Sequence, residues 1–283
     1  MKITPAGTAR ITLSTLLEMK AAGRKMAFLT AYDYPTAALA QAAGVHGLLV
    51  GDSLATVLLG HPNTRAAPLH LMITLAEAVR RGAPNVYLIG DMPYEAVTGG
   101  PQAALGAAER FCREAGCDAV KLEATEGDEQ LVRSLTAAGV PVIAHLGLRP
   151  QQVLSPDGYR AQARDAESVA RLVDDARRLV AAGAVMLLLE AVPNEASAAV
   201  VAEVAVPVIG CGAGPACDGH ILVTQDMLGL STVRPPRFVP LLAQVGEVML
   251  EAMRGYVQQV LEGRYPGPEH VYHMRNRRED NGR

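Results

Sequence analysis

The segment 101–145, PQAALGAAERFCREAGCDAVKLEATEGDEQLVRSLTAAGVPVIAH, alternates long amphipathic stretches with short apolar runs. Its stretches 101–116 and 128–139 repeat their apolar residues with a helical period, and each ends on a glycine, which helix C-termini favour. The runs Ala119–Leu122 and Val140–Ala144 are apolar along most of their length instead of alternating with polar residues. Such runs are typical of parallel strands buried on both faces. The segment therefore predicts two helix–strand repeats of an α/β fold.

The same alternation extends over the whole chain. The expected strands are Met26–Ala31, Gly47–Val50, Val86–Ile89, Ala119–Leu122, Val140–Ala144, Val185–Leu189, Val206–Ile209 and Ile221–Val223. Eight strand–helix units predict a closed (β/α)8 barrel, with a doubly wound open sheet as the alternative, because a count of strands does not show closure. An additional helix at 13–23 could cover the bottom of the barrel, and 238–263 is long enough for two more. No linker divides the chain, so we expect one domain over residues 1–283.

Composition restricts the kinds of protein that this chain can be. Hydrophobic residues make up 49% of its 283 residues and charged residues 19%, which excludes a disordered or collagen-like chain. A net charge of −3 argues against nucleic-acid or anionic-membrane partners, since clustered Lys and Arg bind both. No apolar run reaches the roughly 18 residues of a membrane span, and the start MKITPAGTAR does not resemble a signal peptide. We therefore expect a cytoplasmic protein with reduced cysteines that binds a small molecule or copies of itself.

Polar residues follow five consecutive expected strands at their carboxyl ends. They are Asp52 and Ser53, Asp91, Lys121 and Glu123, His145, and Glu190. In a barrel, residues at these ends converge on one mouth, where active sites are built. Any one of them could be a helix cap or a solvated loop residue, but four carboxylates gathered there repel one another unless a cation is bound. Oxygen ligands without clustered His or Cys favour Mg²⁺ or Mn²⁺ at such a site.

Lys121 is one of only four lysines among 26 basic residues. Lys121 and Glu123 are two residues apart on one strand, so their side chains point to the same side, which we expect to be the barrel interior. Two roles for Lys121 stay open. It forms an internal ion pair with Glu123 or Asp91, or it stabilises negative charge that develops on a substrate.

Glu190 and His145 are the candidate bases. Glu190 follows three leucines, and this apolar setting favours the neutral carboxyl group, whereas a nearby metal favours the charged one. Such tunable basicity suits a general base, and the alternative is a carboxylate that only bonds a neighbouring loop. His145 is either a hydrogen-bonded core residue or part of the same site. The glycine-rich run 209–214 could cradle a phosphate, although we favour a tight connection, and 155–164 is long enough to form a lid.

Motifs along nearly the whole chain resemble those of the ketopantoate hydroxymethyltransferase family. They run from LTAYDYP at 29–35 through VGDSL, RRGAPN, GDMP, VKLE, AHLGLRPQ, LLLEAVP, IGCGAG and DGHILV to YPGPEH at 265–270. The resemblance implies a single catalytic TIM barrel of the phosphoenolpyruvate/pyruvate type. It implies transfer of a hydroxymethyl unit from the co-substrate 5,10-methylenetetrahydrofolate to 3-methyl-2-oxobutanoate, giving 2-dehydropantoate in pantothenate biosynthesis. It also implies bound Mg²⁺ and assembly into a homodecamer.

The resemblance assigns roles to the residues at the strand ends. These are metal ligation for Asp52, Asp91 and Glu123; substrate binding for Asp52, Ser53, Asp91 and Lys121; and catalysis for Glu190, Lys121 and His145, with Glu190 as the proton acceptor. The chain departs from the family pattern at 65–72, 157–164 and 225–229, outside the metal set, so we expect the activity to be retained. Two other functions stay open: a metal-dependent carbon–carbon lyase of oxo acids, and a non-catalytic ring-forming paralogue that binds an oxo acid without turnover.

Overall fold

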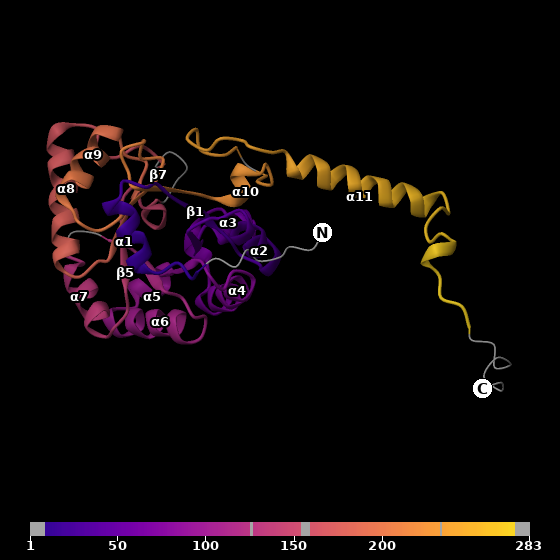
Figure 1. Cartoon of the computed structure of the whole chain (residues 1–283), viewed down its shortest axis with the longest axis horizontal. Helices are drawn as coiled ribbons and strands as arrows, with labels where there is room; N and C mark the ends of the chain where they lie inside the picture. The colour runs from indigo at the N-terminus through magenta and orange to yellow at the C-terminus, as the bar shows by residue number, and fades with distance from the viewer. Residues whose placement is uncertain (1–8, 125–126, 154–158, 233, 275–283) are drawn as a thin grey trace.

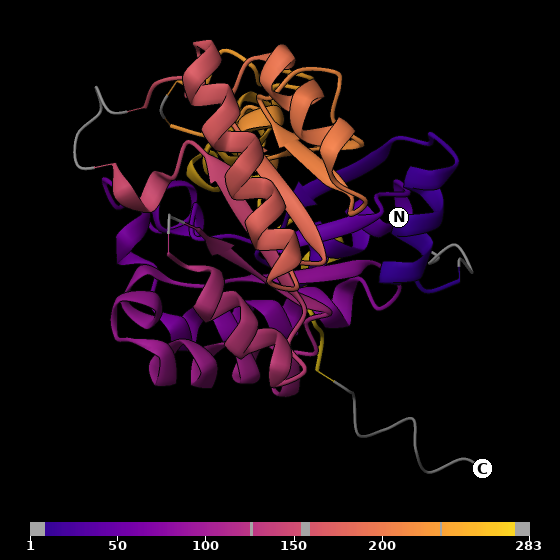
Figure 2. The same cartoon turned by 90° about the vertical axis from the view of Figure 1, so that its left-hand side faces the viewer.

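The computed structural model describes residues 9–124, 127–153, 159–232 and 234–274, and its centre is a closed barrel of eight parallel strands (Figure 1, Figure 2). The strands are β1 (Met26–Thr30), β2 (Gly47–Val50), β3 (Tyr87–Asp91), β4 (Ala119–Glu123), β5 (Val142–Gly147), β6 (Met186–Glu190), β7 (Val208–Cys211) and β8 (Gly219–Leu222). β1 pairs in parallel with both β2 and β8, which closes the barrel. The predicted (β/α)8 barrel is confirmed, and the open sheet is excluded.

Every predicted strand overlaps an observed one, and the differences lie at the ends. β5 begins two residues later and ends three residues later than predicted, at Val142 and Gly147. Pro141 lacks an N–H and cannot donate to the strand ladder, so the regular strand starts after it. The shift matters for function because it places His145 inside β5 and not just beyond its end.

Helices surround the barrel. They are α1 (Leu13–Ala21), α2 (Tyr34–Ala42), α3 (Leu54–Val57), α4 (Leu69–Gly82), α5 (Tyr94–Thr98), α6 (Pro101–Arg113), α7 (Glu129–Ala137), α8 (Ala166–Ala181), α9 (Asn194–Glu203), α10 (Thr224–Met227) and α11 (Val245–Leu261), with 3-10 turns η1 (Thr64–Ala66), η2 (Pro150–Gln152) and η4 (Pro268–His270). α8 illustrates why they form. The Asp165 side chain caps its first turn by accepting from Ser168 N, and Leu172, Ala176 and Leu179 make one buried stripe.

Two apolar clusters fill the barrel and its surroundings. Alternate strand residues point outward to the helices, as Val120 and Leu122 do, and the other set fills the interior. Leu16 and Met19 of α1 belong to the interior cluster together with Met26 of β1. The predicted helix at 13–23 therefore does cover the bottom of the barrel.

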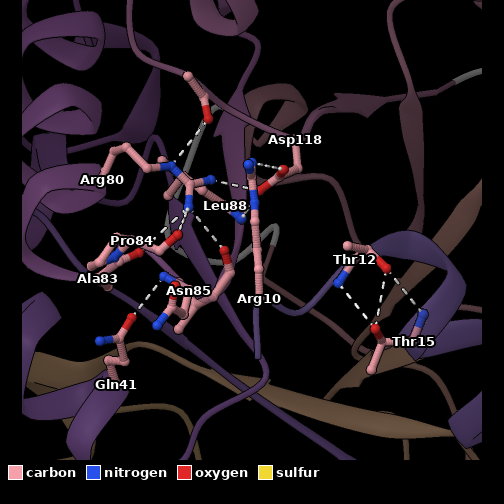
Figure 3. A network of polar contacts seen from close by, with 12 residues as sticks. Arg10, Thr12, Thr15, Gln41, Arg80, Ala83, Pro84, Asn85, Leu88 and Asp118 are labelled. Carbon is pink, nitrogen blue, oxygen red and sulfur yellow. Dashed lines mark hydrogen bonds and ion pairs between the residues drawn. The ribbon is translucent and has the colours of Figure 1, made fainter. Parts of the chain in front are cut away.

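A network of ionic hydrogen bonds ties the loops together at this lower end (Figure 3). Asp118, just before β4, accepts from Arg10 at 2.7 Å, from Arg80 at 2.5 Å and from the backbone N–H of Leu88 at 2.8 Å. The Arg80 guanidinium also donates to four backbone carbonyls, those of Ala83, Pro84, Val86 and Gly116. Asp118 and Arg80 at the bottom of the barrel thus have several partners each.

The last helix differs from the others, since none of its residues is buried. α11 projects away from the barrel in Figure 1. The prediction of two helices in 238–263 is wrong, because Pro235, Pro236 and Pro240 precede α11 and leave 234–244 irregular. Within the described residues, no helix combines the length and apolar character that crossing a membrane requires. All four cysteines are free thiols, as predicted.

Candidate active site

A cavity of about 120 Å³ lies at the carboxyl ends of the strands. The predicted site residues that line it are Asp52, Ser53, Asp91, Lys121, His145 and Glu190. Much of the remaining wall is apolar and includes Leu188, Ile221 and Phe238. Parallel strands in a closed barrel present their carboxyl ends on one side, so residues far apart in the sequence meet here. The structure brings six of the seven predicted residues to one cavity, and the seventh, Glu123, lies buried beside them.

Four of the lining side chains form a row across the barrel mouth. Lys121 Nζ lies 2.9 Å from Asp91 Oδ1 and 3.3 Å from His145 Nδ1. On the far side of the imidazole ring, His145 Nε2 lies 3.3 Å from Glu190 Oε2. The ion pair expected for Lys121 therefore exists, and its partner is Asp91. The same ammonium also faces the cavity, so the ion pair does not exclude contact with a substrate.

The tautomer of His145 follows from this row. A lysine ammonium can only donate, so Nδ1 of His145 must accept and the ring proton of the neutral imidazole is assigned to Nε2. Burial and the positive charge of Lys121 hold the pKa of His145 well below 6.5, so the ring is neutral at pH 7. The Nε2–H has no well-aligned acceptor among the described residues, although Glu190 is near it. The neutral ring of His145 therefore presents an N–H to the cavity.

The carboxyl groups of the site are poorly solvated. Burial raises the pKa of Glu190 to about 8, against the opposing effect of Lys121. Burial likewise raises the pKa of Asp91 to about 7 and that of Glu123 to about 8, and repulsion by Asp52 adds to both. Burial alone would lower the pKa of Lys121, but the surrounding carboxylates raise it above its usual value. The site thus combines one lysine ammonium with three carboxyl groups whose pKa values are raised toward neutral pH.

Gln151 is a site residue to which the sequence analysis gave no role. Its backbone N–H donates to both oxygens of Glu123, at 3.1 and 3.2 Å. Its side-chain amide donates to Asp52 Oδ2 at 2.9 Å and to the carbonyl of Met92 at 3.0 Å. The AHLGLRPQ motif contained Gln151, but only the turn η2 shows that one residue bonds two of the predicted metal ligands.

Two further residues were also missed. Tyr32 is buried, and its hydroxyl lies 2.7 Å from Ser53 Oγ, which fixes the Ser53 side chain at the cavity. Burial raises the pKa of Tyr32 above its usual value, so this hydroxyl stays protonated. Asp226 of α10, in the divergent segment 225–229, also lines the cavity. Tyr32 directly follows the first predicted strand, so the strand-end argument could have found it, whereas Asp226 lies in α10 beyond β8 and has no such signal.

The glycine-rich run after β7 forms a close-packed connection. Gly212 adopts φ +66°, and a Cβ on it would come within 2.5 Å of the Phe238 ring. Gly214 adopts φ +77°, and a Cβ there would meet the Asn194 side chain at 2.6 Å. The tight connection that we favoured is therefore confirmed, and Gly212 lets Phe238 reach the cavity wall. The predicted lid at 155–164 falls partly on 154–158, which lie outside the described residues.

The donor set of Asp52, Asp91 and Glu123 fits a hard divalent cation. Carboxylate oxygens are ligands that Mg²⁺ prefers, and burial with mutual repulsion opposes ionisation of this group unless positive charge is supplied. Among the described residues, no three acidic, His or Cys side chains are already gathered closely enough to hold a metal. Instead, Lys121 engages Asp91 and the Gln151 amide engages Asp52.

Sequence comparisons identify relatives of this chain. The family model for ketopantoate hydroxymethyltransferase matches residues 10–268. A 3-methyl-2-oxobutanoate hydroxymethyltransferase of Geobacillus kaustophilus is 44% identical over 257 residues, covering 91% of this chain and 92% of that protein. The protein of the same name from Thermus thermophilus is 45% identical over 252 residues, covering 89% of this chain and 96% of its own length. The resemblance found in the motifs is confirmed over most of the chain.

Solved structures of other proteins share the barrel architecture of this chain. A phosphonopyruvate hydrolase in complex with oxalate and Mg²⁺ superposes with a TM-score of 0.61 at 15% identity, covering 93% of this chain and 92% of that one. A 2,3-dimethylmalate lyase of the PEP mutase/isocitrate lyase superfamily gives a TM-score of 0.58 at 21% identity, covering 90% and 89%. At these identities the likeness establishes the fold, and the chemistry has to be argued from the site itself.

Proposed function

Because the chain belongs to the ketopantoate hydroxymethyltransferase family, we propose that it transfers a hydroxymethyl unit from 5,10-methylenetetrahydrofolate to 3-methyl-2-oxobutanoate, giving 2-dehydropantoate for pantothenate biosynthesis. The observation that carries this proposal is the position of Glu190. Its carboxyl group lies buried at an apolar cavity, with a pKa raised to about 8, beside a fixed lysine ammonium and a neutral histidine. Such a group can accept a proton from carbon and return it.

The first step is proton transfer from C3 of the oxo acid to Glu190. The electron pair of the broken C–H bond becomes the C2–C3 double bond of an enolate, and negative charge moves to the former keto oxygen. Lys121, whose ammonium faces the cavity, is placed to stabilise that charge without a covalent bond to the substrate. C3 then bonds to the methylene carbon of the folate, whose two C–N bonds break in turn so that tetrahydrofolate leaves. A water molecule supplies the hydroxyl group of the product and one proton to a folate nitrogen, and Glu190 returns the proton taken from C3 to the other nitrogen. A general base typically contributes about 10² to 10⁴ in rate.

A divalent cation, Mg²⁺ by resemblance, would be held by Asp52, Asp91 and Glu123 and would polarise the keto group of the substrate. The chain itself supplies the orientation. Ser53, fixed by Tyr32, is proposed to contact the substrate together with Asp52, Asp91 and Lys121. The Nε2–H of His145 lies 3.3 Å from Glu190 Oε2 without a well-aligned hydrogen bond, and it is proposed to orient this carboxylate when the two groups align. We assign catalysis to Glu190 and Lys121, with His145 as their positioning partner.

We also propose that this single catalytic domain, residues 1–283, works in the cytoplasm as a homo-oligomer, a decamer by family resemblance. Both buried apolar clusters of the described residues belong to the barrel. α11 exposes Val248, Met249, Leu250, Met253, Tyr256, Val257, Val260 and Leu261, an apolar surface that another copy could cover. Four free cysteines suit a reducing compartment.

One assay tests the proposed reaction. The purified protein is incubated with 3-methyl-2-oxobutanoate and 5,10-methylenetetrahydrofolate, with Mg²⁺ or with excess chelator, and 2-dehydropantoate is measured. We expect product only when folate and metal are both present. Folate-independent cleavage of a carbon–carbon bond would instead identify an oxo-acid lyase. Binding of the oxo acid without C3 proton exchange would identify a non-catalytic paralogue.

A further inference from the structure

The divergent segment 65–72 contributes an arginine to the surroundings of the site. Arg65, in η1, donates from Nε to the carbonyl oxygen of Gln151 at 2.5 Å. Its guanidinium carbon lies 4.3 Å from the centre of the Tyr94 ring, at the start of α5. Arg65 thus joins the loops that follow β2, β3 and β5.

Gln151 is the residue through which this contact reaches the acidic cluster. It is only 2% exposed, and it donates to Glu123 through the backbone and to Asp52 through the side-chain amide. Like-charged carboxylates close together turn away from one another unless donors fix them. The Gln151 donors act on two of the three proposed metal ligands at once.

We propose that Arg65, Tyr94 and Gln151 form a clasp that positions the Asp52 and Glu123 carboxylates for a divalent cation. The clasp rests on the proposed function, because it presumes the metal site, and its members are positioning residues that do not touch the substrate. A planar guanidinium can stack one face on Tyr94 while its Nε edge donates to Gln151. Leucine provides neither contact, and lysine cannot provide both in this geometry. Hydrogen-bond partners of metal ligands typically change metal affinity by about 10- to 100-fold.

Mn²⁺ binding to the full-length protein, measured by calorimetry without substrates, tests the clasp. Gln151→Ala is expected to weaken Mn²⁺ binding by about 10- to 100-fold. Its matched control is Gln152→Ala, which alters the exposed neighbour in the same turn and is expected to leave the affinity unchanged. Arg65→Leu removes one hydrogen bond and one cation–π contact, so a loss of roughly 10-fold is expected. Arg133→Leu, at an exposed arginine of α7, is the control for that variant.

A second measurement distinguishes a positioning defect from a loss of folding. Thermal unfolding shows which variants are folded. If Gln151→Ala does not fold, the Mn²⁺ affinity of Arg65→Leu alone tests the clasp. Folded variants should regain near wild-type kcat at saturating Mn²⁺, because a positioning defect is overcome by mass action. Wild-type affinity in both Gln151→Ala and Arg65→Leu, while the wild-type protein binds Mn²⁺, would overturn the clasp and leave the proposed reaction intact. Failure of the wild-type protein to bind Mn²⁺ would reject the metal site and the clasp together.

Discussion

The two ends of the barrel differ in how their charged side chains are partnered. At the bottom, Asp118 accepts from two arginines and a backbone N–H (Figure 3). At the mouth, burial raises the pKa of Glu190 and Asp91, and the Nε2–H of His145 has no well-aligned acceptor among the described residues. The polar groups of the lower end stabilise the fold through several partners, whereas those of the mouth have raised pKa values and fewer partners, as the proposed proton transfer and cation binding require.

The largest effect is expected from Asp91→Ala at the mouth. Asp91 is the partner of Lys121 and a proposed metal ligand, so turnover should fall by more than about 10³-fold. The fold should persist, because Asp52 and Glu123 still face the Lys121 ammonium. Product formation and circular dichroism of the variant measure the two quantities. An active variant, or a wild-type enzyme that works in excess chelator, would reject the metal hypothesis.

Asp118→Ala at the bottom of the barrel should have the opposite effect, a loss of stability without a loss of turnover. It leaves Arg80 and the backbone N–H of Leu88 without the carboxylate that accepts from them, so the free energy of unfolding should fall by about 2 kcal/mol, with kcat of the folded enzyme unchanged. Asp174→Ala is the control, because Asp174 forms an exposed, solvent-screened pair with Arg178 and should change the stability far less. Urea unfolding measures the stability of both variants. A large loss of kcat in Asp118→Ala would show that the two ends are not separate.

His145→Asn tests whether the His145 ring positions Glu190 at the barrel mouth. Removing the donor that faces Glu190 should slow turnover by about 10-fold, less than removal of a base would. Nitrogen NMR of the wild-type protein at pH 7 should show a neutral ring with its proton on Nε2. A proton on Nδ1 would contradict the assigned bond from Lys121.

The smallest effect concerns pH and stability. Glu190 has a folded pKa of about 8 against an ordinary value of 4.5, so between these values the folded state binds more protons than the unfolded state. Stability of the metal-free protein should therefore fall as pH rises toward 8, by at most ~1.4 kcal/mol per pH unit for one such group. His145 acts in the opposite direction only below pH 6.5. Urea unfolding between pH 6.5 and 8 measures the slope. Glu190→Gln should reduce this slope without abolishing it, because Asp91 and Glu123 also have raised pKa values and contribute in the same direction.

Much of the mouth could be predicted because strand geometry is periodic. The two-residue spacing of Lys121 and Glu123 on β4 was enough to place both side chains on the interior face, and the end of β6 placed Glu190. Gln151 and Arg65 could not be assigned, because their contacts depend on how two short turns meet. The hydrogen bonds of Arg80 could not be predicted for the same reason, because its partners come from separate loops.

Deuterium exchange at C3 of 3-methyl-2-oxobutanoate tests the central claim, that Glu190 is the base of this mouth. The reaction is run in heavy water with metal and without folate, so that only proton removal is observed. The wild-type enzyme should exchange the C3 proton, and Glu190→Gln, which keeps the shape of the side chain, should exchange it about 10² to 10⁴ times more slowly at similar substrate affinity. Equal exchange by both proteins would contradict the account and place the base elsewhere.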